Sequence, residues 1–394
     1  MTFTTPSETF GSRKKRLGVV LHTSFFRDGG CLYLKELWAD YIIECLAPCF
    51  EHTVVLGPIQ TGSQAGRFQF QPFGGPRIQV IELPTQGIRP LRAIASVVAV
   101  ARFVRASDTV WILAPAWRGV LSAAFCWLLS RDYVLYVGGD WAELPPTGAP
   151  MRQIRLFVER AVARRARFIL CAGEVIFDRL RRSGRPVIRR VPPMRLTLAH
   201  LYRREDSIST AGVRLLYVGS LGAHKGVEYL IRALPILRAR GITVECDLVG
   251  PGTESDRERL RSIAKLCVAE ESVHHWGYLP NGPELFGRYR EASVFVLPTL
   301  SEGFPRVLFE AMGHGVPIIS TAVGGIPDAL RDGADCLLVS PRSPEQIAEA
   351  VVQLVTQPLL RKRIIARGYE IVERELAQSP GQQVAELLST FGLI

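Results

Sequence analysis

The chain has 394 residues, which is more than one ordinary domain holds and about right for two. Hydrophobic residues make up 47% of the sequence and aromatic residues 9%, so each domain can bury a core and a largely disordered chain is excluded. The net charge of +11 is uneven, because residues 1–200 contain 27 Lys and Arg against 14 Asp and Glu, whereas residues 201–394 contain 21 against 23.

Short apolar strands alternate with helical patterns in the first half of the chain. The sequence predicts strands at 16–24, 52–58, 77–84, 109–115, 133–140 and 167–173, and helices at 31–46, 89–104 and 151–166. Such alternation indicates a parallel sheet covered by helices on both faces. No apolar run approaches the roughly 20 residues of a membrane-spanning helix, so the apolar stretches 92–104 and 119–130 are expected to be buried helices.

The pattern breaks at residues 183–211, where prolines and then a polar segment occur, and it resumes in the second half. Strands are predicted at 214–220, 243–252, 272–279, 293–299, 316–323 and 335–340, with helices at 226–240, 254–266, 305–314 and 344–355. We therefore expect an α/β protein of two doubly wound, Rossmann-like domains, at 1–200 and 201–375, followed by a helical tail at 376–394. The carboxyl ends of the strands would bind ligands on either side of a cleft.

The eight cysteines form no C-x-x-C pair, and most of them lie in apolar runs, which predicts buried and reduced thiols. The start of the chain shows no secretory pattern, so a cytoplasmic protein is expected. No His, Cys and Asp cluster has the spacing of a metal site, and neither a Walker loop nor a dinucleotide fingerprint occurs. The sequence therefore predicts neither a metal nor a cofactor.

The segment SEGFPRVLFEAM carries two carboxylates, Glu302 and Glu310, around a predicted helix that opens near Phe304 and Pro305. The unpaired N–H groups of a helix start bind anions, and carboxylates accept hydrogen bonds from vicinal hydroxyls. A diphosphate flanked by a ribose and a sugar ring fits this pattern. The alternative is an acid favoured by the helix dipole followed by a solvated Glu.

Lys225 follows a glycine-containing loop after the strand at 214–220 and lies just before a helix. A compact positive charge at that position suits a diphosphate whose charge grows as it leaves. The alternative is a surface lysine, although the helix dipole disfavours a cation there. The neighbouring His224 is interpreted as a solvated loop histidine.

Two weaker signals lie in the first half. Gly29 and Gly30 follow the first strand and permit close approach of the backbone to a ligand, although an ordinary turn explains them equally. Asp140 lies just beyond the strand at 133–140, where it could act as a base toward an acceptor hydroxyl or cap a helix.

The first half also contains a basic amphipathic stretch. Residues 151–200 hold 13 Arg against 3 acids, and residues 152–168 combine several of these arginines with apolar side chains. The stretch is compatible with an anionic membrane surface or a lipid diphosphate, and also with an ordinary helix whose polar face is solvated. Nucleic acid is not expected, because no reader motif accompanies the basic run.

Taken together, VGSLGAHKG, LVGPG, WGYL, ADCLLVSP and EGFPRVLFEAMGHGVPIISTAVGGIPD resemble the successive signatures of glycosyltransferase family four, the retaining glycosyl transferases group 1 with the GT-B fold. The resemblance covers most of residues 214–375. It implies that the first domain binds the acceptor, that the second binds the nucleotide-sugar donor, and that the tail at 376–394 packs back on the first domain.

The resemblance also implies roles for individual residues. Glu310 would hold the ribose hydroxyls, Glu302 the hydroxyls of the donor sugar, and Lys225 the diphosphate. The remaining donor-binding positions would be the turn before the helix, the base pocket and the facing glycines, namely Gly303, Phe304, Pro305, Tyr278, Leu279, Gly29 and Gly30.

Two positions depart from the family pattern. The phosphate-binding Arg that commonly lies five residues before the Lys is Ser220 here, which offers a hydrogen bond but no charge. Where the family often has His-Asp, this chain has Gly139 and Asp140, so a His contact to the sugar is missing.

The sequence therefore predicts a hexosyltransferase-type enzyme that moves a sugar from a nucleoside-diphosphate sugar to an acceptor hydroxyl with retention and without a metal. Glu302, Lys225 and Asp140 would be its catalytic residues. The acceptor would be a glycan or a lipid-linked molecule of bacterial polysaccharide or glycolipid biosynthesis, at the inner face of a membrane. A nucleotide-sugar epimerase of the same fold and a nucleotide-sugar-binding pseudoenzyme remain alternatives.

Overall fold

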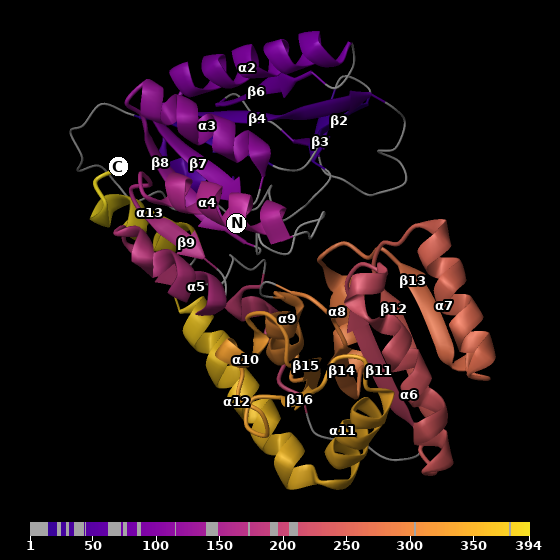
Figure 1. Cartoon of the computed structure of the whole chain (residues 1–394). Helices are drawn as coiled ribbons and strands as arrows, with labels where there is room; N and C mark the ends of the chain where they lie inside the picture. The colour runs from indigo at the N-terminus through magenta and orange to yellow at the C-terminus, as the bar shows by residue number, and fades with distance from the viewer. Residues whose placement is uncertain are drawn as a thin grey trace.

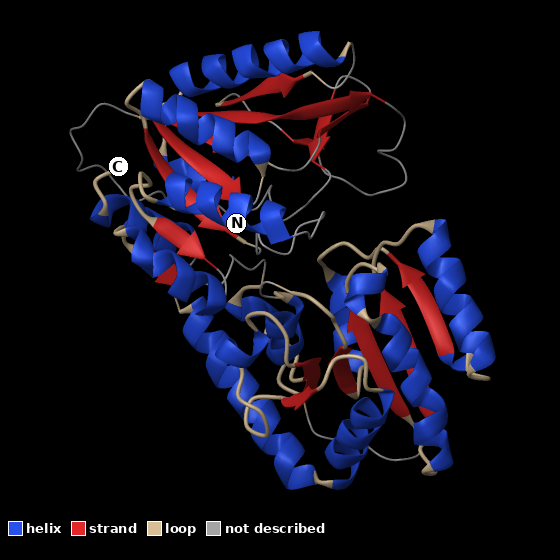
Figure 2. Cartoon of the chain, in the orientation of Figure 1, coloured by secondary structure: helices blue, strands red, loops and turns tan. Residues whose placement is uncertain are grey.

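The computed structural model describes residues 15–21, 25–28, 31–34, 43, 45–61, 72–73, 77–84, 88–114, 116–138, 149–171, 174–189, 196–204, 212–302, 305–377 and 380–394. These residues form two α/β units, each built on its own sheet (Figure 1; Figure 2). The predicted fold class of two α/β domains with doubly wound sheets is therefore confirmed.

The sheet of the first unit has the strand order β10-β9-β8-β7-β1-β4-β2-β3-β5, and β6 pairs with β4 beside this path. Its strands are β1 (Arg16–Val20), β2 (Phe25–Asp28), β3 (Cys31–Leu34), β4 (His52–Thr61), β5 (Pro72–Phe73), β6 (Ile78–Leu83), β7 (Thr109–Ala114), β8 (Asp132–Val137), β9 (Ile169–Cys171) and β10 (Val187–Arg189). The described helices of eight or more residues in this unit are α2 (Arg89–Arg105), α3 (Trp117–Leu128) and α4 (Ala149–Ala163), and the shorter α5 spans Glu174–Leu180.

The predicted helix at 31–46 is wrong in its first four residues, which form β3. This strand pairs antiparallel with β2, with Asp28 opposite Cys31, and also antiparallel with β5. The sequence contains a signal for this pairing, because two short runs rich in β-forming residues flank a Gly-Gly dipeptide. The first sheet is therefore mixed, with a parallel body of β10-β9-β8-β7-β1-β4-β6 and an antiparallel extension.

The sheet of the second unit is parallel throughout and has the order β13-β12-β11-β14-β15-β16. Its strands are β11 (Val213–Val218), β12 (Val244–Val249), β13 (Val273–Gly277), β14 (Val294–Leu297), β15 (Ile318–Thr321) and β16 (Leu337–Val339). The helices that follow are α6 (Val227–Ala239), α7 (Glu254–Leu266), α8 (Pro283–Glu291), α9 (Val307–Gly313), α10 (Ile326–Ala329), α11 (Pro344–Thr356), α12 (Pro358–Leu376) and α13 (Pro380–Thr390). The strand order reverses between β11 and β14, and the loops after these two strands are where such sheets bind ligands.

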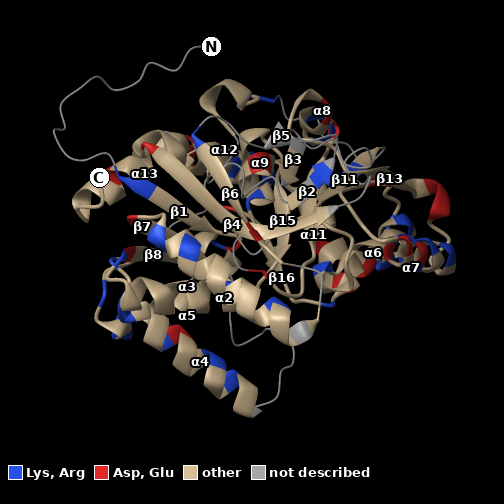
Figure 3. Cartoon of the chain, turned by 90° about the horizontal axis from the view of Figure 1, so that it is seen from above, with Lys and Arg blue, Asp and Glu red and all other residues tan. Residues whose placement is uncertain are grey.

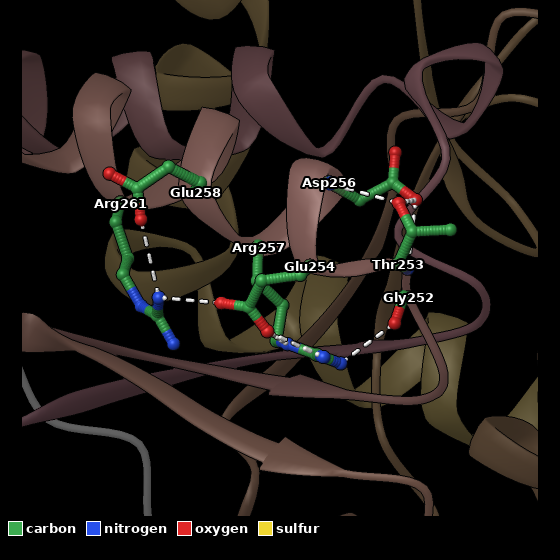
Figure 4. A network of polar contacts seen from close by, with 7 residues as sticks. All are labelled: Gly252, Thr253, Glu254, Asp256, Arg257, Glu258 and Arg261. Carbon is green, nitrogen blue, oxygen red and sulfur yellow. Dashed lines mark hydrogen bonds and ion pairs between the residues drawn. The ribbon is translucent and has the colours of Figure 1, made fainter.

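The loop after β12 is tied to the start of α7 by a polar network (Figure 4). Thr253 and Asp256 form a capping box, in which the Thr253 hydroxyl accepts from the Asp256 N–H and the Asp256 carboxylate accepts from the Thr253 N–H. Arg257 donates to the Gly252 carbonyl oxygen at 2.7 Å and to Glu254. This loop, next to the β11 loop, is therefore closely fixed.

The end of the chain returns to the first unit. Helix α12 packs on the core of the second unit, and α13 contributes Val384 and Leu388 to the core on one face of the first sheet (Figure 1). Phe391 stacks on Phe168 with ring centroids 4.6 Å apart, and Arg167 donates to the Phe391 carbonyl oxygen at 2.9 Å. A separate core on the opposite face of the first sheet is covered by α2, α3, α4 and α5.

The apolar stretches 92–104 and 119–130 were predicted to be buried helices. Each is buried on one side only. Phe103 of α2 and Cys126 of α3 are fully buried, whereas Ile94 and Trp127 are 63% and 60% exposed. These helices form the outer layer over the sheet, so only their inner sides reach the core. Among the described residues, no helix has both the length and the apolar character needed to cross a bilayer.

Helix α6 is bounded by two glycines with left-handed backbone, Gly226 at φ 64° and Gly241 at φ 78°. A Cβ on Gly226 would lie 2.1 Å from the carbonyl oxygen of Pro298, whereas a Cβ on Gly241 would meet nothing within 4 Å. We expect Gly241→Ala to lower the free energy of unfolding by about 1–2 kcal/mol, from backbone strain alone. Gly226→Ala should lower it by about 3 kcal/mol or more, because the backbone must also move.

Urea unfolding of the two variants measures this difference. Equal losses for Gly226→Ala and Gly241→Ala would show that the β11 and β14 loops are not in close contact at Gly226.

Candidate functional site

Two of the predicted site residues meet where the strand order reverses. Lys225 ends a short helical turn (Ala223–Lys225) after β11, and Glu302 lies in the loop after β14. Their Nζ and Oε1 atoms are 2.5 Å apart, and the side chains are only 17% and 19% exposed. The structure thus brings together two oppositely charged groups that are far apart in sequence.

Backbone and hydroxyl contacts hold the two loops against each other. The Leu300 N–H donates to the His224 carbonyl oxygen at 2.9 Å, which joins the β14 loop to the residue before Lys225. Within the β14 loop, the Thr299 hydroxyl donates to the Ser301 carbonyl oxygen at 3.0 Å. The Thr321 hydroxyl of β15 donates to the Thr299 carbonyl oxygen at 2.5 Å. The ion pair is therefore positioned by paired backbone and not by side chains alone.

Glu310 lies in α9 and is supported by a buried tyrosine. The Tyr289 hydroxyl, from α8, donates to Glu310 Oε2 at 2.9 Å, and the Tyr289 side chain is fully buried. Burial raises the pKa of the Glu310 carboxyl, while the Tyr289 hydrogen bond and the charge of Arg306 oppose this rise. The Glu310 carboxylate is thus held in one orientation, with one oxygen occupied by Tyr289.

His314 adds a second support beneath Glu310. Its ring lies nearly parallel to that of Tyr289, with centroids 5.2 Å apart, and its Nδ1 donates to the Glu310 carbonyl oxygen at 2.7 Å. Its side chain is fully buried, and burial lowers the pKa of the imidazole. The neutral ring is therefore a fixed packing surface for Tyr289.

Arg306, which directly precedes α9, links the two units electrostatically. Burial raises the pKa of Tyr136, near the end of β8, and the positive charge of Arg306 counteracts this rise. The same charge acts on Glu310. The charge of Arg306 thus opposes the effect of burial on one ionisable group in each unit.

No sequence pattern predicts a role for Tyr289, His314 or Arg306. Apolar residues at 285, 286 and 289 predict a buried side of α8 but not a contact with Glu310. Arg306 lies between Glu302 and Glu310 in the sequence, and this position is the feature from which its place near the site could have been predicted.

The other predicted positions in the second unit lie near this edge. Ser220 follows β11 and is half-buried, and its carbonyl oxygen accepts from the Tyr217 hydroxyl at 2.6 Å. Tyr278 and Leu279 follow β13, and Leu279 packs partly against the core. Pro305 is buried, but the helix begins two residues after it, at Val307, and has only seven residues.

Five predicted site residues lie outside the described part of the chain, namely Gly29, Gly30, Asp140, Gly303 and Phe304. Within the described ranges, no three His, Cys, Asp or Glu side chains gather as a metal site would require.

The second unit also matches a known family. Residues 212–357, which contain Lys225, Glu302 and Glu310, match the family model described as glycosyl transferases group 1. This unit belongs to the glycosyl transferases group 1. An uncharacterized glycosyltransferase of Methanocaldococcus jannaschii is 30% identical over 164 residues, which cover 42% of this chain and 41% of that protein. The aligned region thus spans less than half of the relative's length.

Solved structures resemble the chain over both units. Sucrose-phosphate synthase from Thermosynechococcus elongatus superposes with a TM-score of 0.73 at 19% identity, covering 96% of this chain and 99% of that one. Anabaena HepE in complex with UDP-glucose gives a TM-score of 0.71 at 18% identity, covering 95% and 100%. The group 1 domain and the preceding unit therefore together have the GT-B fold.

The raised pKa of Glu310 predicts a pH dependence of stability. A carboxyl whose folded pKa exceeds its unfolded value favours folding while protonated, so this contribution is lost as the pH rises from about 4.5 through the folded pKa. The wild type should lose stability relative to Glu310→Gln across that window, measured by urea unfolding at successive pH values. Glu386→Gln, at an exposed acid of α13, is the control and should show no such trend.

A constant difference in stability between the wild type and Glu310→Gln at all pH values would contradict a desolvated Glu310.

Proposed function

We propose that this chain transfers a sugar from a nucleoside-diphosphate sugar to a hydroxyl of an acceptor. The observation that carries the proposal is the Lys225–Glu302 ion pair at the strand-order reversal of a group 1 domain, in the segment that also supplies Glu310. A nucleotide sugar as donor is supported by the likeness in fold to HepE, whose structures hold UDP and UDP-glucose.

Glu310 suits the ribose of such a donor. Tyr289 occupies Oε2, which leaves Oε1 to accept from a ribose hydroxyl, and the side chain retains some exposure. A carboxylate fixed by a buried hydrogen bond loses little side-chain entropy when a ligand binds.

Lys225 and Glu302 suit the reacting end of the donor. Lys225 and Glu302 are largely buried, so a ligand can separate them only if it gives each charge a new partner, as a diphosphate does for Lys225. Glu302 would then accept from hydroxyls of the donor sugar. Because Ser220 brings no charge, Lys225 carries the electrostatic stabilisation of the departing diphosphate, and we propose that no metal is needed.

We propose that the anomeric configuration is retained, by a front-side route. The bond between the anomeric carbon and the diphosphate oxygen breaks, and the acceptor oxygen forms its bond on the same side. The acceptor proton passes to the departing diphosphate, so the products are a glycoside and a nucleoside diphosphate. Asp140 as a base toward the acceptor stays a prediction, because it lies outside the described residues.

For the acceptor we propose a glycan or a lipid-linked glycan of bacterial polysaccharide or glycolipid assembly. The excess of 27 basic over 14 acidic residues in residues 1–200 supports an anionic acceptor or its anionic membrane surroundings.

A thermal-shift panel of nucleotide sugars, followed by turnover of the best binder, tests the function. A donor at 100 times its dissociation constant should stabilise the protein by about 2.7 kcal/mol. Lys225→Ala and Glu302→Ala should each lower kcat by about a hundredfold or more, because each removes an interaction at the reacting centre. Lys265→Ala, at an exposed lysine of α7, is the matched control and should turn over like the wild type.

Unchanged turnover in both site variants would contradict the assignment. Donor conversion without acceptor would instead indicate an epimerase. Donor binding without release of nucleoside diphosphate would indicate a pseudoenzyme.

A further inference from the structure

The outward sides of α2, α3 and α4 expose many large apolar side chains. The most exposed of them are Phe157 at 73%, Leu128 at 69% and Ile88 at 68%. The complete set is Ile88, Leu91, Ile94, Val97, Val98, Trp117, Trp127, Leu128, Ile154 and Phe157. We call this set, with the exposed arginines named below, the outer helix face. Helix α3 contacts both α2 and α4, and Figure 3 shows the three helices on the same side of the molecule, so they form one layer over the sheet.

The apolar residues of α2 form a second stripe that does not face the core. Leu91, Ile94 and Val98 recur at intervals of three and four residues, which places them on one side of the helix. The core-facing side of α2 is built instead from residues such as Phe103 and Val104, which are fully buried. Large apolar side chains that gather on the exposed side of one helix layer mark an interaction site.

Helices α2, α3 and α4 carry positive charge and no exposed carboxylate. Helices α2 and α3 contain no acid, and the one acid of α4, Glu159, is 1% exposed and lies 2.8 Å from Arg179. Exposed arginines stand on α2, on α4 and in the turn after α4, namely Arg102, Arg105, Arg152, Arg160, Arg164 and Arg165. Arg165 lies over the exposed Trp127 ring, 4.5 Å from its centroid. The outer helix face therefore complements an anionic partner.

Part of the exposed apolar set lies at the carboxyl edge of the first sheet. In a parallel sheet each helix starts where the preceding strand ends, so the first halves of α2, α3 and α4 lie at that edge. Leu91, Ile94, Trp117 and Ile154 belong to these first halves, whereas Trp127 and Leu128 end α3 at the opposite edge. This end of the outer helix face thus adjoins the sheet edge at which the acceptor would bind.

We propose that the outer helix face docks onto an anionic lipid bilayer. Its aliphatic and aromatic side chains would enter the boundary between headgroups and acyl chains, and its arginines would contact the lipid phosphates. A second copy of the chain is a poorer occupant, because two arginine-rich surfaces without carboxylates repel each other. Docking itself does not depend on the proposed function. Only its consequence rests on that function, namely that a lipid-linked acceptor would be presented at the neighbouring sheet edge.

Vesicle flotation tests the docking without any turnover. The full chain should float with vesicles of phosphatidylcholine and phosphatidylglycerol, float little with phosphatidylcholine alone, and be released by salt. Leu91→Gln/Ile94→Gln should lower the partition coefficient by about tenfold or more, because two aliphatic side chains no longer enter the interface. Leu266→Gln/Leu359→Gln is the matched control, since these residues are 80% and 83% exposed on the second unit, and it should bind like the wild type.

Three results would overturn the proposal. They are absence of flotation, equal loss in the control pair, and a lipid-free dimer in light scattering that Leu91→Gln/Ile94→Gln abolishes. Thermal melting confirms that each variant folds. Donor hydrolysis or transfer to a water-soluble acceptor, measured in parallel, separates the two proposals, because loss of transferase activity in a protein that still floats refutes only the function.

Discussion

The contact between Lys225 and Glu302 is the interaction on which the rest of the site depends. It joins the loops after β11 and β14, the two strands between which the second sheet changes direction. Both charges are largely removed from water, so neither loop can move away without leaving the other charge unpaired. The absence of a side chain at Gly226 permits the close approach of the two loops. A ligand with a negative charge can replace Glu302 as the partner of Lys225, and its hydroxyls can replace Lys225 as the partner of Glu302. The proposed binding of a diphosphate and a sugar rests on this exchange.

Glu310 is held by a different physical arrangement. Its carboxylate accepts from the uncharged Tyr289 hydroxyl, and the ring of Tyr289 packs nearly parallel to that of His314. The second unit thus combines an exchangeable ion pair with a fixed carboxylate. The two arrangements suit the two parts of the proposed donor. The fixed carboxylate would hold the ribose in one orientation, and the ion pair would contact the diphosphate and the sugar as the bond between them breaks. The outer helix face is independent of this site. It is formed by surface residues of the first unit, and the contacts of Lys225, Glu302 and Glu310 do not contribute to it.

The sequence predicted the fold class because the buried parallel strands of both units are continuous apolar runs, each followed by a helical pattern. It also placed Lys225 and Glu302 after two such strands, whose carboxyl ends meet at one edge. The role of Tyr289 could not be predicted, because its contact with Glu310 depends on how α8 packs beside α9. The strand β3 was missed because CLYL continues into a helical pattern. The exposure of Ile94 was missed because an apolar helix that covers a sheet and one that lies wholly in a core have the same composition.

The most direct measurement is a calorimetric titration of a nucleoside diphosphate and its 2′,3′-dideoxy analogue into the wild type and Glu310→Ala. The titration uses the nucleoside diphosphate that stabilises the protein most. If Glu310 accepts from the ribose while Lys225 holds the diphosphate, the wild type should bind the analogue at least about tenfold more weakly than the parent, as expected for a lost hydrogen bond to a charged group. Glu310→Ala should bind both nucleotides almost equally. The same loss of affinity for the analogue in the wild type and in Glu310→Ala would contradict the account.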